Sequence, residues 1–179
     1  AMTKACASCG VYGLMRSGEM TYKGKRYHIL RRSDVTWHAN SLEIRLRNSK
    51  TDYLRQGVTI RLSANGSASC PFRLLRNAWN RATNQCLDAA LFQTQSGGPL
   101  HYKTLLLAIK RSIAALGITG NYGGHSLRAG GATTLALMGY PDSLIKILGR
   151  WKSLSYQRYI QLDPNTFRDV SVDMAKQGK

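Results

Sequence analysis

GGHSLRAGG occupies residues 123–131, and LGRWKSLSYQRYI follows at residues 148–160. The apolar spacing over 125–139 predicts a helix, on which His125 and Arg128, three residues apart, share one face. The glycines around them permit a close approach of another backbone or of a ligand. An imidazole and a guanidinium that face one object suit a phosphate. The sequence therefore predicts a phosphate site. The other residues of the chain indicate whether this site only binds the phosphate or catalyses a reaction on it.

The charge of the chain points to a polyanionic partner. Its 179 residues include 26 Lys and Arg against 9 Asp and Glu, a formal net charge of +17. Nucleic acid is the first candidate for such a surplus. An anionic membrane fits less well, because the basic residues are spread along the chain and not gathered on one amphipathic stretch. No run of about 18 apolar residues and no signal-peptide pattern is present, so we expect an intracellular protein.

Four cysteines raise the question of a metal. Cys6 and Cys9 have the spacing of half a zinc site, but Cys70 and Cys86 form no second close pair. We expect all four to be buried, reduced thiols. No acidic cluster has metal-ligand spacing, so the sequence predicts neither a cofactor nor a metal.

The hydrophobic periodicity predicts an α+β fold, mainly helical with a small sheet. Residues 3–20 are expected to form a helix that ends near a glycine turn. Apolar and polar residues alternate over 42–47 and 58–62, which is typical of half-buried strands. Residues 35–62 should thus form a three-stranded antiparallel meander with Lys50 near the tip of its second connection. Further helices are expected at 71–86, 102–117, 125–139, 141–149, 153–161 and 164–175.

Seven residues together match the chemistry of phosphoryl transfer. Taken singly, each has an ordinary structural explanation. Together they supply two guanidinium forks for the non-bridging oxygens, a histidine for proton transfer, a lysine acid for a leaving alkoxide and a tyrosine nucleophile. The set is Arg16, Glu19, Lys50, His125, Arg128, Trp151 and Tyr159.

The order Arg, Lys, His-x-x-Arg, Trp, Tyr resembles the catalytic domain of the tyrosine recombinase (phage integrase) family, which shares its chemistry with type IB topoisomerases. The resemblance extends over nearly the whole chain, from the GLMRSGE motif to the YI that contains Tyr159. The sequences of the motifs HSLRAGGATTLA and LIKILGRWKS are most similar to those of eukaryotic recombinases of the DIRS-like retrotransposon type. The resemblance implies a DNA integrase of a transposable element that joins strands through a 3′-phosphotyrosyl intermediate. It would be nuclear if the eukaryotic likeness holds.

The resemblance also implies roles for the residues. Arg16 and Arg128 would clamp the scissile phosphate, His125 would assist proton transfer, and Lys50 would protonate the 5′-oxygen. Trp151 would take the place where many members have a second histidine and donate its indole N–H to a phosphate oxygen. Glu19 would support the site from behind.

Tyr159 is the expected nucleophile, with Tyr156 as the alternative one turn away. In many members nine positions separate the His or Trp from the tyrosine, whereas here Tyr159 follows Trp151 by eight.

Residues 3–179 should then be a catalytic domain without the family's N-terminal DNA-clamping domain. Two other functions stay open: a non-catalytic DNA-binding module, and a topoisomerase-like nicking-closing enzyme. Phe167, Val170 and Met174 would form an apolar stripe on a short C-terminal helix. We expect this stripe to be exchanged between protomers when copies assemble on double-stranded DNA, although folding back onto its own domain is nearly as well supported.

Overall fold

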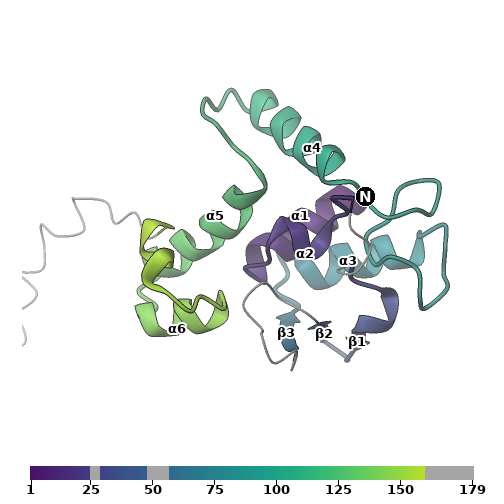
Figure 1. Ribbon diagram of the computed structural model, residues 1–179, viewed down its shortest axis with the longest axis horizontal. Coiled ribbons are helices and arrows are strands. Elements are labelled where there is room, and N and C mark those ends of the chain that lie inside the picture. The colour runs from purple at the N-terminus through teal and green to yellow at the C-terminus, as the bar shows by residue number, and fades with distance from the viewer. Residues whose placement is uncertain (25–28, 48–56, 160–179) are drawn as a thin grey trace, which may run out of the picture.

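The computed structural model describes residues 1–24, 29–47 and 57–159, with the backbone alone for 158 and 159. The elements in chain order are α1 (Met2–Tyr12), α2 (Ser17–Met20), η2 (Arg32–Asp34), β1 (Val35–Trp37), β2 (Ser41–Leu46), β3 (Val58–Ser63), α3 (Pro71–Asn80), α4 (Tyr102–Ala115), α5 (Gly124–Leu137), α6 (Asp142–Leu148) and η3 (Leu154–Tyr159). The predicted mixed fold, mainly helical with a small sheet, is confirmed (Figure 1). None of the helices described is long and apolar enough to cross a membrane.

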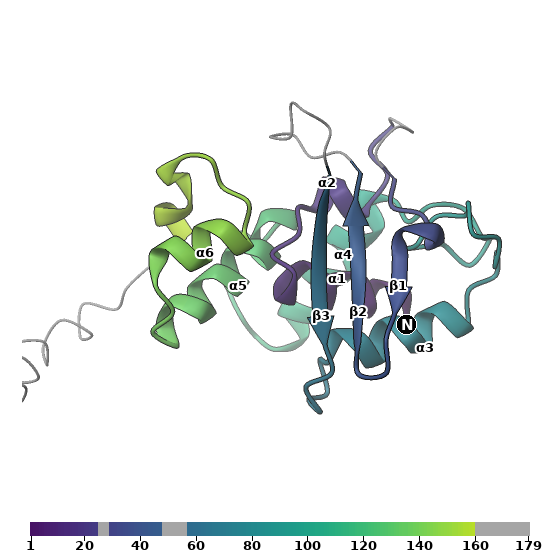
Figure 2. The ribbon, with the colours of Figure 1, turned by 90° about the horizontal axis from the view of Figure 1, so that it is seen from below.

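The three strands form the predicted antiparallel meander in the order β1-β2-β3. Ile44 pairs with Val35 on one side and with Ile60 on the other. Leu42, Ile44 and Leu46 are buried, as their alternation predicts. Figure 2 shows α1 and α3 behind the sheet, so the apolar face of the strands packs on these helices.

A second, smaller apolar cluster lies beside this main core. It joins Leu14 to Ala132 of α5, Ile145 of α6 and Tyr156 of η3. The two parts meet where α5 crosses α1: a Cβ on Gly131 would lie 2.6 Å from a methyl of Leu14 and closer still to the Val11 carbonyl oxygen. Glycine is therefore required at this crossing, because any side chain would push the two helices apart.

The helix expected at 3–20 is wrong as a single element. The structure ends α1 at Tyr12, turns through Leu14, whose φ is +45°, and begins α2 at Ser17. A left-handed leucine is costly, and the cost is offset because the turn sends the Leu14 side chain into the second cluster. Sequence periodicity does not report such a tertiary compensation.

Three further predictions need correction. The helix expected at 71–86 ends at Asn80, since the Asn84 side chain accepts the Cys86 backbone N–H at 3.0 Å and forms a local turn instead. Cys86 is exposed on this turn, whereas Cys6, Cys9 and Cys70 are buried; all four are free thiols. The described part of the segment expected at 153–161 is a 3-10 helix, and the segment 164–175 lies outside the described residues.

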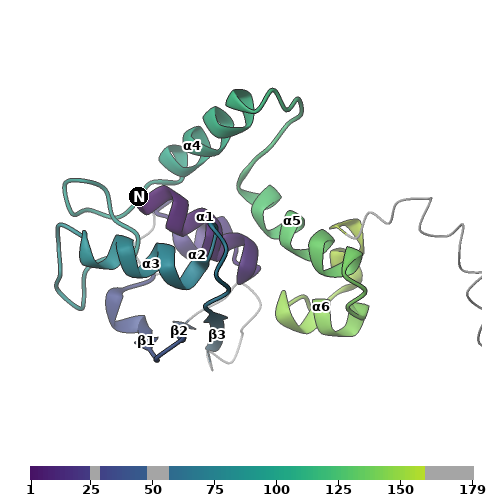
Figure 3. The same ribbon diagram turned by 180° about the vertical axis from the view of Figure 1, so that it is seen from behind.

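Helix α4 differs from the others in its burial. Of its residues only Leu105 is fully buried, and Leu107 is 49% exposed. Figures 1 and 3 show α4 leaving the body of the molecule at its N-terminal end and returning through the segment that leads into α5. The α4–α5 connection thus delivers the chain to the start of α5, where the predicted phosphate-binding residues begin.

Candidate active site

Arg16 stands at the start of α2, directly against Glu19. The carboxylate of Glu19 accepts the Arg16 backbone N–H at 2.8 Å and its guanidinium Nη1 at 3.0 Å. The first contact caps the helix start, because backbone donors there lack intrahelical partners. The side chain of Arg16 is 24% exposed and that of Glu19 only 8%. Glu19 thus binds Nη1 of the Arg16 guanidinium from the buried side, while part of the Arg16 side chain stays accessible to solvent.

The N-terminus of α5 lies against the start of α2. A Cβ on Gly124 would be 2.7 Å from Ser17 Oγ and 2.6 Å from the Tyr102 ring, so only glycine fits between them. Ser17 follows Arg16 and His125 follows Gly124, so this contact brings the two predicted site residues into the same region. His125 is exposed in the first turn of α5. The backbone N–H groups of that turn favour a nearby anion.

Arg128 is buried on the second turn of α5 and is engaged with the α6–η3 segment. Its Nη2 donates to the Gly149 carbonyl, and its guanidinium carbon lies 4.1 Å from the centre of the Trp151 ring. Trp151 in turn folds directly over Gly149, where a Cβ would overlap the indole. The structure therefore brings Arg128 and Trp151 together, with the indole stacked on the arginine.

The two tyrosines of η3 differ in their surroundings. Tyr156 is 4% exposed and packs in the second cluster with Leu14 and Ile145. Its burial, together with the neighbouring Asp142 carboxylate, raises the pKa of the Tyr156 phenol. Tyr159 ends η3, and its side chain lies outside what the structure describes. Lys50 also lies outside the described residues, in the connection between Leu46 and Val58, which are paired ends of β2 and β3.

Arg150 is a site residue that the sequence interpretation missed. Its side chain is 8% exposed, and its Nη2 lies 3.0 Å from the Glu19 carboxylate that also holds Arg16. Burial, and then the nearby Arg16 charge, lower its pKa, while Glu19 acts in the opposite direction. A signal was present in the sequence: Arg150, and not Trp151, precedes Tyr159 by the nine positions common in the family that the sequence resembles.

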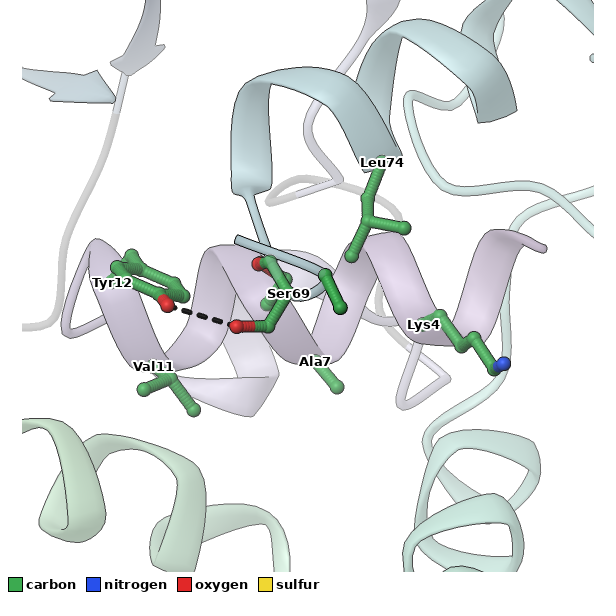
Figure 4. A pocket seen from close by; sticks show the side chains of 8 residues that line it. Lys4, Ala7, Val11, Tyr12, Ser69 and Leu74 are labelled. Carbon is green, nitrogen blue, oxygen red and sulfur yellow. Dashed lines mark hydrogen bonds between the residues drawn. The ribbon is translucent and has the colours of Figure 1, made fainter. Parts of the chain in front are cut away.

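A cavity of about 520 Å³ lies elsewhere, between α1 and the segment that leads into α3. Figure 4 shows Tyr12 of α1 directed toward Ser69, with a 2.9 Å hydrogen bond between the two hydroxyls; Lys4 of α1 and Leu74 of α3 also line the cavity. None of the predicted site residues lines it. The predicted phosphate-binding residues Arg16 and His125 lie at the α2–α5 junction and not in this cavity.

The chain is similar to known proteins both in its family and in its fold. The phage integrase family matches residues 14–166. A search of curated proteins finds no match.

Solved structures with a similar fold include three recombinases. The XerA recombinase is 20% identical with a TM-score of 0.72, over 97% of this chain and 56% of that chain. The XerH site-specific recombinase bound to palindromic difH substrate, in a post-cleavage complex, is 20% identical with a TM-score of 0.71, over 94% and 44%. A lambda integrase dimer bound to a COC′ core site is 16% identical with a TM-score of 0.61, over 90% and 42%. The chain spans about half the length of these proteins.

Proposed function

The chain belongs to the phage integrase family, and we propose that residues 3–179 form the catalytic domain of a DNA strand transferase with Tyr159 as its nucleophile. The phenol oxygen of Tyr159 forms a bond to a backbone phosphorus, the bond to the 5′-oxygen breaks, and a 3′-phosphotyrosyl ester remains. Attack by the 5′-hydroxyl of a second strand reverses the step. Bond energy is conserved, so no nucleotide cofactor has to supply it.

The observation that carries this proposal is the junction of α2 and α5. The contact of Gly124 with Ser17 joins segments more than one hundred residues apart and sets Arg16 and His125 in one region. Arg16 is oriented by a buried carboxylate yet accessible. Pre-oriented donors are what a transition state with charge on its phosphoryl oxygens requires.

Each group then has one role in the step. Arg16 and Arg128 contact the non-bridging oxygens, for which a planar guanidinium is suited. His125, exposed beside the phosphate, assists transfer of the phenol proton. Lys50 gives a proton to the departing 5′-oxygen. Trp151 donates its indole N–H to the phosphate and stacks on Arg128.

The surroundings of Tyr156 support Tyr159 as the nucleophile. The Tyr156 ring packs with Leu14, Ala132 and Ile145, and its hydroxyl is engaged by the Asp142 carboxylate. Its raised pKa also disfavours the phenolate.

The partner that fits this function is double-stranded DNA, which agrees with the charge of +17. XerH and lambda integrase are DNA-bound in their structures, and lambda integrase is a dimer there. We extend this to a synaptic oligomer of the present chain on DNA. From the sequences of its motifs we also assign the chain to the DIRS-like retrotransposon recombinases. A recombinase of this type would act in the nucleus of a eukaryotic host.

Covalent capture on DNA tests the proposal. A library of nicked duplexes with randomised sequence traps any phosphotyrosyl adduct. The short fragment that carries the new 5′-hydroxyl diffuses away, so the strand cannot be religated. Mass spectrometry should then find the DNA on Tyr159. Tyr159→Phe should remove the adduct and keep DNA binding, and Tyr156→Phe should retain the adduct within several-fold. An adduct on Tyr156 would refute the choice of nucleophile; DNA binding without any adduct would leave only a binding module.

A further inference from the structure

Arg150 makes four hydrogen bonds through the two terminal nitrogens of its guanidinium. Its Nη1 donates to the carbonyls of Gly13 at 3.3 Å and Leu148 at 3.4 Å. Its Nη2 donates to the Leu14 carbonyl at 3.1 Å and to Glu19 Oε2 at 3.0 Å. Three of these four acceptors lie in the α1–α2 segment, more than one hundred and thirty residues away in sequence. Arg150 therefore joins the C-terminal part of the chain to the segment that bears Arg16.

Glu19 connects Arg150 to Arg16. Its Oε1 accepts Arg16 Nη1, and its Oε2 accepts both the Arg16 backbone N–H and Arg150 Nη2. The side chains of Glu19 and Arg150 are both 8% exposed. Loss of Glu19 leaves the buried Arg150 charge uncompensated, and loss of Arg150 leaves Glu19 paired with Arg16 alone. The position of the Glu19 carboxylate, and with it that of Arg16, thus depends on Arg150.

Backbone strain marks the same contact. Leu14 with φ +45° and Arg150 with φ +59° are the non-glycine residues in the left-handed region within the described part of the chain. The Arg150 guanidinium binds the Leu14 carbonyl, so the two strained residues hold each other. The Leu14 side chain packs on Tyr156, one turn before Tyr159. Strain of this kind persists only where surrounding contacts over-determine it.

We propose that Arg150 is a positioning residue, which couples the η3 segment that ends at Tyr159 to the Glu19 carboxylate that orients Arg16. This inference rests on the proposed function. Arg150 is assigned no contact with the phosphate, because the four hydrogens of its two terminal nitrogens already go to three carbonyls and the Glu19 carboxylate. Lysine is a poor substitute, because one ammonium cannot span two carbonyls and a carboxylate in a fixed plane.

Single-turnover cleavage of nicked duplexes selected from the randomised library tests the coupling. Arg150→Met and Glu19→Gln should each slow adduct formation at saturating DNA by about 100-fold, the effect of a misplacement of about 1 Å, with the DNA dissociation constant changed by less than about threefold. Arg150→Lys should recover part of the rate. The double variant should be no slower than the slower single variant, because both changes break one unit.

Arg32→Met is the matched control. Arg32 is 3% exposed, donates to the Trp79 carbonyl at 3.1 Å and stacks on the Trp79 ring, but contacts none of the site residues whose side chains the structure describes. Its loss should lower the melting temperature and leave the cleavage rate of the folded protein within about threefold of the parent. If Arg150→Met lowers stability and cleavage no more than Arg32→Met does, Arg150 is an ordinary structural residue and the proposal is wrong.

Hydrogen exchange gives a readout that needs no cleavage. Amides of residues 13–20 should exchange about tenfold faster in Arg150→Met and in Glu19→Gln, and at the parent rate in Arg32→Met. Unchanged exchange over 13–20 in Arg150→Met would overturn the coupling. An absent adduct in the parent chain, with the exchange result as expected, would instead refute the proposed function and leave the coupling in place.

Discussion

Gly131→Ala should destabilise the protein, although alanine is the better helix former. At an open helical position the change gains about 1 kcal/mol. At Gly131, however, the new methyl would meet a Leu14 methyl at 2.6 Å and lie closer still to the Val11 carbonyl oxygen. The oxygen belongs to the main chain of α1 and cannot rotate away, so the overpacking cost falls at the upper end of about 1–3 kcal/mol. The net effect is a loss of about 2 kcal/mol from these two ranges.

Gly130→Ala is the matched control, one residue earlier in α5. A Cβ there meets nothing within 4 Å, so only the gain in helix propensity remains. By thermal unfolding followed by circular dichroism, Gly131→Ala should melt about 4–8 °C below the parent, and Gly130→Ala about 2–4 °C above it. Adding Leu14→Ala should not rescue Gly131→Ala, because the Val11 oxygen stays in place. A Gly131→Ala melting temperature at or above that of the parent would refute the close crossing of α1 and α5.

Four further predictions follow from the proposed chemistry and from the burial of the core. Lys50→Ala should slow cleavage of a normal phosphodiester far more than that of a 5′-bridging phosphorothiolate, whose sulfur leaves without a proton; equal slowing of both would exclude Lys50 as the acid. DNA affinity should fall steeply with salt through counterion release, and a flat salt titration would contradict an electrostatic interface. Phe167→Asp with Met174→Asp should impair oligomers on DNA, measured by sedimentation, more than the melting temperature; the reverse would assign the stripe to the domain's own core. Burial raises the pKa of Cys9 from 9.0 to about 12, so the unfolded thiol loses its proton first and the free energy of unfolding falls as pH rises from 9.0 towards 12. Urea unfolding should show a smaller loss in Cys9→Ala, and an identical pH dependence in both proteins would contradict this burial.

The sequence alone determined the features that depend on local periodicity. The alternation around Ile44 and Ile60 predicted the strands and their buried face, and the apolar spacing after Gly123 predicted α5. Residue order also gave a candidate catalytic set of Arg, His-x-x-Arg, Trp and Tyr, which stays a prediction. The strand and helix signals are visible in sequence because each depends on residues only a few positions apart.

The tertiary structure decided what depends on contacts between distant segments. The break of the first helix at Leu14 follows from a side chain that packs on α5, α6 and η3. The burial of Tyr156, which periodicity could not separate from Tyr159, depends on the same cluster. Arg150 was missed because its acceptors, at Gly13, Leu14 and Glu19, become neighbours only when the ends of the chain meet. A left-handed arginine and a carboxylate shared by two guanidiniums are stable only inside such a closed arrangement, where each group fixes the others and water is excluded.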